Sequence, residues 1–168
     1  MAVDFEIEEV EDDADSRIVE SFAAFDEKTI ERLVKFSFSE LQVSQETELS
    51  IAVVGEEEME RIHLEWMDLA GPTDVMSFPM DEMKPGSAEN LASGVLGDII
   101  LCPTVAAEQA QRAGHSTLDE FCLLTVHGIL HCLGYDHATA EEEAEMFSIQ
   151  RDILERFLGR SAPVETRF

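Results

Sequence analysis

Residues 118–137 read LDEFCLLTVHGILHCLGYDH, and up to Leu133 apolar side chains occur on almost every side of a helix. A helix that is apolar all round is a buried one, so we expect this segment to run through the centre of the domain. Thr117 and Glu120 can form a capping box at its start. Gly134 can end it in a left-handed conformation. The stretch therefore predicts a central buried helix followed by a tight turn.

Three histidines fall within this helix and the turn after it. His127 and His131 are four residues apart and so lie on one face of the helix, and His137 follows on the returning chain. Three neutral imidazoles can bind one metal ion and leave a fourth position open for water, which is the catalytic form of a zinc site. The sequence therefore predicts one Zn²⁺ per chain on His127, His131 and His137, although other divalent transition metals could take its place.

The spacing of these histidines is similar to the H-E-x-x-H-x-x-G-x-x-H motif of zinc metalloproteases. Position 128 is glycine, however, where such a protease needs the glutamate that serves as its general base. Peptide hydrolysis by the usual route would lack its proton acceptor. A zinc metalloprotease-like hydrolase is therefore kept only as the alternative interpretation.

Hydrophobic patterns in the rest of the chain predict a mixture of strands and helices. Alternation or short apolar runs indicate about four strands, near residues 3–7, 47–54, 75–80 and 95–101. Helical periodicity or capping signals indicate further helices, near residues 27–41, 56–68, 104–113 and 139–158. In the second of these helices, Met59, Ile62 and Trp66 should face inward. Because the elements do not alternate strictly, we expect one α+β domain with a mixed sheet packed with helices over residues 1–168.

Weaker sequence signals concern the two ends of the chain and the starts of two helices. Residues 1–20 should form an acidic strand and loop, and residues 160–168 a flexible tail. Thr104 and Thr139 are the expected N-caps of the helices that follow them.

Composition limits the class of protein. The chain has 168 residues, 37 acidic against 11 basic side chains, and a formal net charge of −26. No apolar run reaches the roughly 18 residues of a membrane span, and the acidic N-terminus has no signal-peptide pattern. Three cysteines without an export signal favour reduced thiols in a cytoplasm. Taken alone, the acidity argues against a nucleic-acid partner, because phosphate binding normally requires Lys and Arg.

Three segments nevertheless resemble the YbeY family of bacterial metal-dependent endoribonucleases and ribosomal RNA maturation factors. Residues 127–137, HGILHCLGYDH, resemble the family's H-G-x-L-H-L-x-G-Y-D-H signature. Residues 71–79, GPTDVMSFP, and 96–103, LGDIILCP, resemble its K-P-T-D-V-L-S-F-P and L-G-D-I-x-I-C/S segments. The resemblance covers nearly all of residues 45–158.

The resemblance implies a zinc-dependent, single-strand-specific endoribonuclease in the cytoplasm. It implies roles in maturing the 3′ end of small-subunit ribosomal RNA, in rRNA processing and in ribosome quality control. The expected partners are single-stranded rRNA and the small ribosomal subunit with its assembly factors, with no membrane and no DNA. The chain departs from the family at Met67, where many members carry an arginine, and Arg61 is a candidate substitute.

Other functional residues are less clearly marked. Asp98, Asp136 and Ser77 are candidate catalytic residues, although a carboxylate could instead orient a histidine. Thr73 is a candidate hydrogen-bond donor to a phosphate group of the substrate, or simply a turn residue. Substrate-binding candidates also include a basic stripe on one helix, which could equally be a solvated face: Lys28, Arg32 and Lys35.

Two further expectations concern the role of the metal and the strength of RNA binding. The histidines could hold a structural metal in a non-catalytic, metal-stabilised ribosome assembly factor, which is a second alternative. The net charge of −26 predicts that the isolated protein binds RNA weakly and needs the metal or a ribosomal partner.

Overall fold

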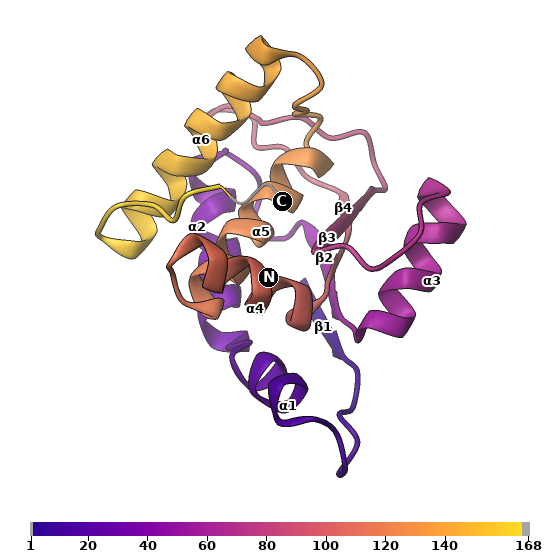
Figure 1. Cartoon of the computed structure of the whole chain (residues 1–168). Helices are drawn as coiled ribbons and strands as arrows, with labels where there is room; N and C mark the ends of the chain where they lie inside the picture. The colour runs from indigo at the N-terminus through magenta and orange to yellow at the C-terminus, as the bar shows by residue number, and fades with distance from the viewer. Residues whose placement is uncertain (1, 166–168) are drawn as a thin grey trace.

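A computed structural model, which describes residues 2–165, shows an α+β domain built on one four-stranded sheet (Figure 1). The strands are β1 (Ala2–Ile7), β2 (Glu48–Val53), β3 (Val75–Pro79) and β4 (Val95–Leu101). Their order across the sheet is β1-β2-β4-β3, with β1, β2 and β4 parallel and β3 antiparallel to β4. The predicted mixed sheet is therefore confirmed, and β3 is an edge strand.

Helices cover both faces of this sheet. The helices are α1 (Ser16–Ala23), α2 (Glu27–Glu40), α3 (Glu56–Met67), α4 (Pro103–Ala113), α5 (Thr117–Cys132) and α6 (Ala140–Leu158). Figure 1 shows α5 between the sheet and the other helices, with α3 on the opposite side of the sheet. Helix α5 contacts β3 and β4 on one side and α2, α4 and α6 on the other. The prediction of a central buried helix is confirmed.

The sequence of α5 explains its central position. Its side chains are buried on every side, including Phe121, Val126 and Ile129, none of which is exposed. Surrounding this helix with apolar neighbours is the only arrangement that removes all of these faces from water. The main core therefore lies between α5, α2, α6 and the inner strands.

Helix α3 forms a second, smaller core on the other face of the sheet. Met59 and Ile62 pack there against Met76 of β3. Trp66, which we predicted to face inward, is 64% exposed instead. Trp66 makes an edge-on contact with Phe78, with the ring centroids 5.6 Å apart, and most of its side chain remains in solvent.

Two helix starts differ from the expected capping. Cys102 occupies the N-cap position of α4, and the Thr104 hydroxyl donates to Glu56 Oε1 at 2.8 Å. Ser116, rather than Thr117, caps α5 by accepting a hydrogen bond from the Asp119 backbone N–H. Thr139 caps α6 as predicted.

The ends of the chain are more ordered than expected. Residues 16–20, predicted as loop, begin helix α1, whose N-cap is Asp15. After α6 the chain turns back, and Arg160 donates two hydrogen bonds to Asp119 at 2.8 and 2.9 Å. Residues 160–165 thus pack against the domain rather than forming a free tail, while 166–168 lie outside the described residues. Within residues 2–165, no helix is long and apolar enough to cross a membrane.

Candidate metal centre

The three predicted histidines converge at one point. His127 and His131 lie one turn apart on α5, with ring centroids 4.6 Å apart. The His137 ring lies 5.3 Å from that of His127 and 5.1 Å from that of His131. One ligand nitrogen from each ring lies within 4.8 Å of the others. This is the arrangement that can hold one metal ion.

A tight turn brings the third histidine back to the helix. Gly134 has a φ of 95°, which only glycine adopts without strain, and it ends α5. Two residues later, the Asp136 carboxylate accepts a hydrogen bond from the His137 backbone N–H at 2.7 Å. This contact joins the Asp136 carboxylate to the backbone of the turn that carries His137.

A buried glutamine, which the sequence analysis missed, holds the first histidine. Gln150 of α6 is 1% exposed, and its Oε1 lies 3.0 Å from His127 Nδ1. An imidazole N–H that donates to this oxygen leaves the other ring nitrogen, Nε2, with a free lone pair for a metal. Gln150 stands among the apolar residues of α6 that face the core, and this interruption was the available sequence signal.

The electrostatics favour a neutral ligand at His131. Burial and the neighbouring His137 lower the pKa of the His131 imidazole. A neutral imidazole is the form that coordinates a transition metal. Three such nitrogens, one of them oriented by Gln150, fit zinc and other ions that prefer imidazole ligands.

Close packing explains the glycine between the two ligands. A Cβ atom at Gly128 would lie 2.9 Å from Ile99 Cδ1 and 3.1 Å from Ser77 Oγ. Ile99 is fully buried, so it has little freedom to move away. Helix α5 therefore lies so close to the sheet that any side chain at position 128 must displace Ile99.

The histidines lie in a cleft of about 580 Å³ along the edge strand β3. One wall comes from α5 and α6, and the other from the C-terminal half of α3, the loop after it and β3. Of the predicted residues, Ser77, Thr73 and Asp136 line this cleft, as does Met67. Among the described residues that line it, none is a lysine or arginine.

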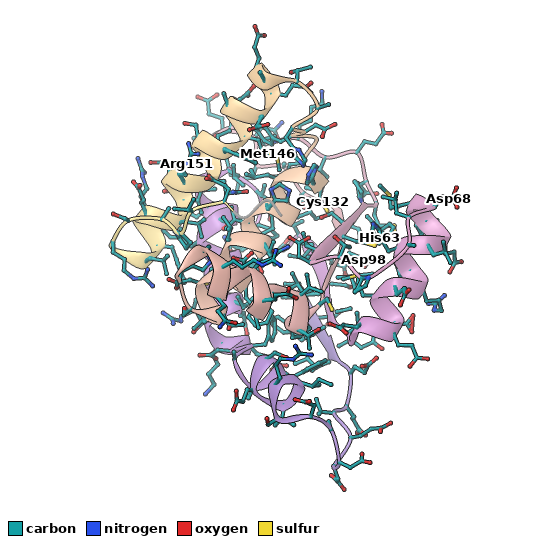
Figure 2. The ribbon with its side chains drawn as sticks, in the orientation of Figure 1. His63, Asp68, Asp98, Cys132, Met146 and Arg151 are labelled. Atoms are coloured by element: carbon teal, nitrogen blue, oxygen red, sulfur yellow. The ribbon has the colours of Figure 1, made fainter. Side chains whose placement is uncertain are left out.

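Asp98 is not among the described residues that line this cleft. Ser77 of β3 pairs with Ile99, and both side chains face α5, whereas the next pair is Phe78 and Asp98. Successive side chains of a strand point to opposite faces, so Asp98 points away from the histidines. Figure 2 shows Cys132 of α5 and His63 of α3 on the two sides of the sheet.

The basic stripe also lies outside the cleft. Lys28, Arg32 and Lys35 are exposed residues of α2, and none of the three lines the cavity. Lys35 pairs with Glu31 at 3.4 Å, and the Arg32 guanidinium lies 5.8 Å from the centre of the Phe157 ring. The interpretation as a solvated helix face fits these positions.

Asp74 is a cleft residue that the sequence analysis did not single out. Its carboxylate accepts hydrogen bonds from the Val75 backbone N–H at 2.7 Å and from the Thr73 hydroxyl at 3.2 Å. Burial raises the pKa of this carboxyl group. The Thr73 hydroxyl therefore already donates its hydrogen bond to Asp74 in this structure. Ser77 Oγ, in contrast, is directed toward Gly128.

Comparisons with known proteins agree with this geometry. The family model for the endoribonuclease YbeY matches residues 11–158. The Endoribonuclease YbeY of Renibacterium salmoninarum is 54% identical over 148 residues, which cover 88% of this chain and 94% of that protein. The Endoribonuclease YbeY of Clavibacter michiganensis subsp. michiganensis is 56% identical over 136 residues, which cover 80% and 89%.

A solved structure shows the same fold. The solution structure of TM1509 from Thermotoga maritima superposes with a TM-score of 0.58 at 22% identity, covering 94% of this chain and 89% of that one. The family model and the relatives that match most of the chain show that the protein belongs to the endoribonuclease YbeY family.

Proposed function

We propose that this protein is a metal-dependent endoribonuclease that cleaves single-stranded RNA during rRNA processing. The observation that carries the proposal is the convergence of three histidine nitrogens within 4.8 Å in an open cleft. Family membership and relatives named endoribonuclease support the same reaction. Phosphodiester hydrolysis is a reaction that a single metal ion can promote.

The metal ligands in this proposal are His127, His131 and His137, and the ion is zinc. When bound, such an ion supplies Lewis acidity, which polarises a phosphoryl oxygen and makes a water molecule more acidic. Gln150 holds His127 in the tautomer that can coordinate, through the 3.0 Å contact with Nδ1. Asp136 fixes the turn that delivers His137.

The remaining cleft residues would bind and position the substrate. Ser77 presents a hydroxyl beside the histidine helix, and it is the candidate hydrogen-bond donor to a phosphoryl oxygen. Asp74, whose pKa is raised by burial, retains a proton to higher pH than an ordinary aspartate. It is therefore the cleft carboxyl that can donate a proton to a leaving oxygen.

The wider role follows from the family resemblance. We propose cytoplasmic maturation of the 3′ end of small-subunit rRNA and participation in ribosome quality control, with the small subunit and its assembly factors as partners. The cleft has three acidic lining residues, Asp74, Asp136 and Glu165, and no lysine or arginine among those described. This charge supports our expectation that free RNA binds weakly.

Neither alternative gains support from the site. The protease alternative requires a glutamate where Gly128 packs against Ile99. The structural-metal alternative requires a fourth protein ligand to close the site. Among the described residues, the cluster with metal-binding geometry consists of three histidines only.

The experiment compares RNA with peptide as the substrate. Zinc-loaded protein, chelator-treated protein and the His131→Ala variant are each incubated with single-stranded rRNA and with a peptide library. We expect RNA cleavage by the zinc-loaded protein, and loss of both zinc and cleavage in His131→Ala. Cleavage of peptide but not RNA would reverse the assignment, and equal RNA cleavage by metal-free His131→Ala would indicate a contaminant.

A further inference from the structure

Large exposed apolar side chains occur on the last turn of α3, in the loop after it and directly after β3. We call these residues the α3 rim. All are more than half exposed: Leu64 53%, Trp66 64%, Met67 57%, Leu69 52% and Met80 60%. Exposed large apolar groups next to a cleft are candidates for a binding surface.

The α3 rim is continuous with the cleft. Met67 lines the cavity directly, and Trp66 touches Phe78, which also lines it. The two rings meet at 68°, so Phe78 holds the indole in place while most of the indole stays exposed. Trp66 is thus separated from the cleft lining by a single ring, that of Phe78.

The charges on the cleft walls limit how such a strand can be held. Phosphates usually bind to lysine and arginine, but the described residues that line this cleft include neither, and three of them are acidic. The chain as a whole carries −26. An uncharged contact is therefore needed, and the face of an unpaired base on an aromatic ring is such a contact.

We infer that Trp66 is a stacking platform for an unpaired base of the RNA strand that leads to the metal centre. The inference rests on the proposed function, because it places the RNA in that same cleft. The base stacks on the exposed indole, Phe78 contacts the indole from the edge, and Met67 lines the adjoining cavity. Bases in a duplex are already stacked and paired, so only a single-stranded segment can use this site.

Trp66 also reports on its own occupancy, because it is the only tryptophan in the chain. The zinc-loaded protein is titrated with a cleavage-resistant phosphorothioate oligoadenylate while indole fluorescence is followed. We expect quenching that saturates with binding, and much weaker quenching by an abasic strand of equal length and charge. Binding of the oligoadenylate can be measured separately with a fluorescent label on the strand. If the labelled strand binds and Trp66 fluorescence stays unchanged, the inference is overturned.

Kinetics provide the second arm. Stacking of a base on an aromatic ring contributes to the free energy of RNA binding. Trp66→Ala should therefore raise the KM for single-stranded RNA about tenfold with little change in kcat. Trp66→Phe should keep most of the affinity, because it keeps a ring. Val19→Ala, on α1 and 44% exposed, is the matched control and should leave both constants unchanged. An unchanged KM in Trp66→Ala would refute the platform.

The two proposals fail in different ways. Absence of RNA cleavage by the zinc-loaded wild type would refute the proposed function. The fluorescence arm needs no cleavage, so it still decides whether a base stacks on Trp66. Normal cleavage together with equal KM values for wild type and Trp66→Ala would refute only the platform.

Discussion

The cleft wall formed by α5 and α6 differs from the wall formed by α3 and the end of β3. On the first, His127 contacts a glutamine that is 1% exposed, and Gly128 packs against a fully buried isoleucine. On the second, Trp66 and Met67 are 64% and 57% exposed and belong to no buried cluster. The first wall is fixed by the core, whereas the second presents large side chains that are more than half exposed.

This difference separates two tasks. A metal centre requires ligands held to within a fraction of an ångström, which only a packed wall provides. Recognition of a flexible strand requires accessible surface that tolerates different bases. Substitutions on the α5 wall should therefore affect stability and metal binding, and substitutions on the α3 wall should affect binding of RNA with little change in stability.

Gly128→Glu should have the largest effect. The new side chain would push Ile99 aside and place a carboxylate in the core, which should lower the free energy of unfolding by more than about 3 kcal/mol. Urea denaturation measures the change. Gly128→Ala is the milder control, at about 1 kcal/mol, because its better helix propensity offsets part of the overpacking. A stable Gly128→Glu protein with peptidase activity would revive the protease alternative.

Gln150→Leu should weaken zinc binding. Loss of the partner on His127 Nδ1 frees the ring to rotate, and such substitutions typically cost about 10- to 100-fold in metal affinity. Competition with a chromophoric chelator measures the change. Gln150→Glu keeps an acceptor at the same position and should bind zinc at least as tightly as the wild type. Equal affinities for wild type and Gln150→Leu would show that the contact does not orient His127.

Met67→Arg tests the opposite wall. The side chain is 57% exposed, so the free energy of unfolding should change by less than about 0.5 kcal/mol. A cation in the cleft should strengthen RNA binding and steepen the slope of log K against log salt by about 0.7. Binding isotherms at several salt concentrations measure this slope, with Val19→Arg as the control. The comparison would be contradicted if Met67→Arg clearly lowered the free energy of unfolding and left RNA binding unchanged.

The smallest expected effect concerns Cys122, whose thiol should not react with a disulfide reagent in the native protein. Burial raises the pKa of this α5 thiol to about 12. A pKa above the ordinary value means less thiolate at a given pH, so at about pH 8 only about one molecule in ten thousand is ionised. A disulfide reagent should therefore modify the native thiol only after the protein unfolds in denaturant. Rapid modification of native Cys122 would show that the α5 wall opens.

The sequence was most informative where local pattern and burial agree. Apolar residues on every side of 118–133 predicted the central helix, and the histidine spacing on it predicted the cluster that the structure shows. The helix and the proximity of His127 and His131 follow from the helical repeat, and Gly134 signals the turn that returns His137 to them. The four strands were also predicted within one or two residues, because their flanking residues are clear turn signals.

The errors arose where the outcome depends on how distant segments pack. Gln150 lies 23 residues beyond His127, and only the docking of α6 on α5 brings the two together. Asp98 shares a family segment with the site, but the register of β4 directs its side chain away. Trp66 follows the apolar repeat of α3, but its tertiary packing is limited to an edge-on contact with Phe78, so most of the side chain stays exposed.

The account depends on the histidine cluster being the catalytic metal centre. Its most direct test is a zinc titration of chelator-treated protein in which single-stranded RNA cleavage is measured at each addition. We expect cleavage to be absent without metal, to rise linearly and to reach its maximum at one zinc per chain. Full cleavage by protein shown to contain no metal would contradict the account.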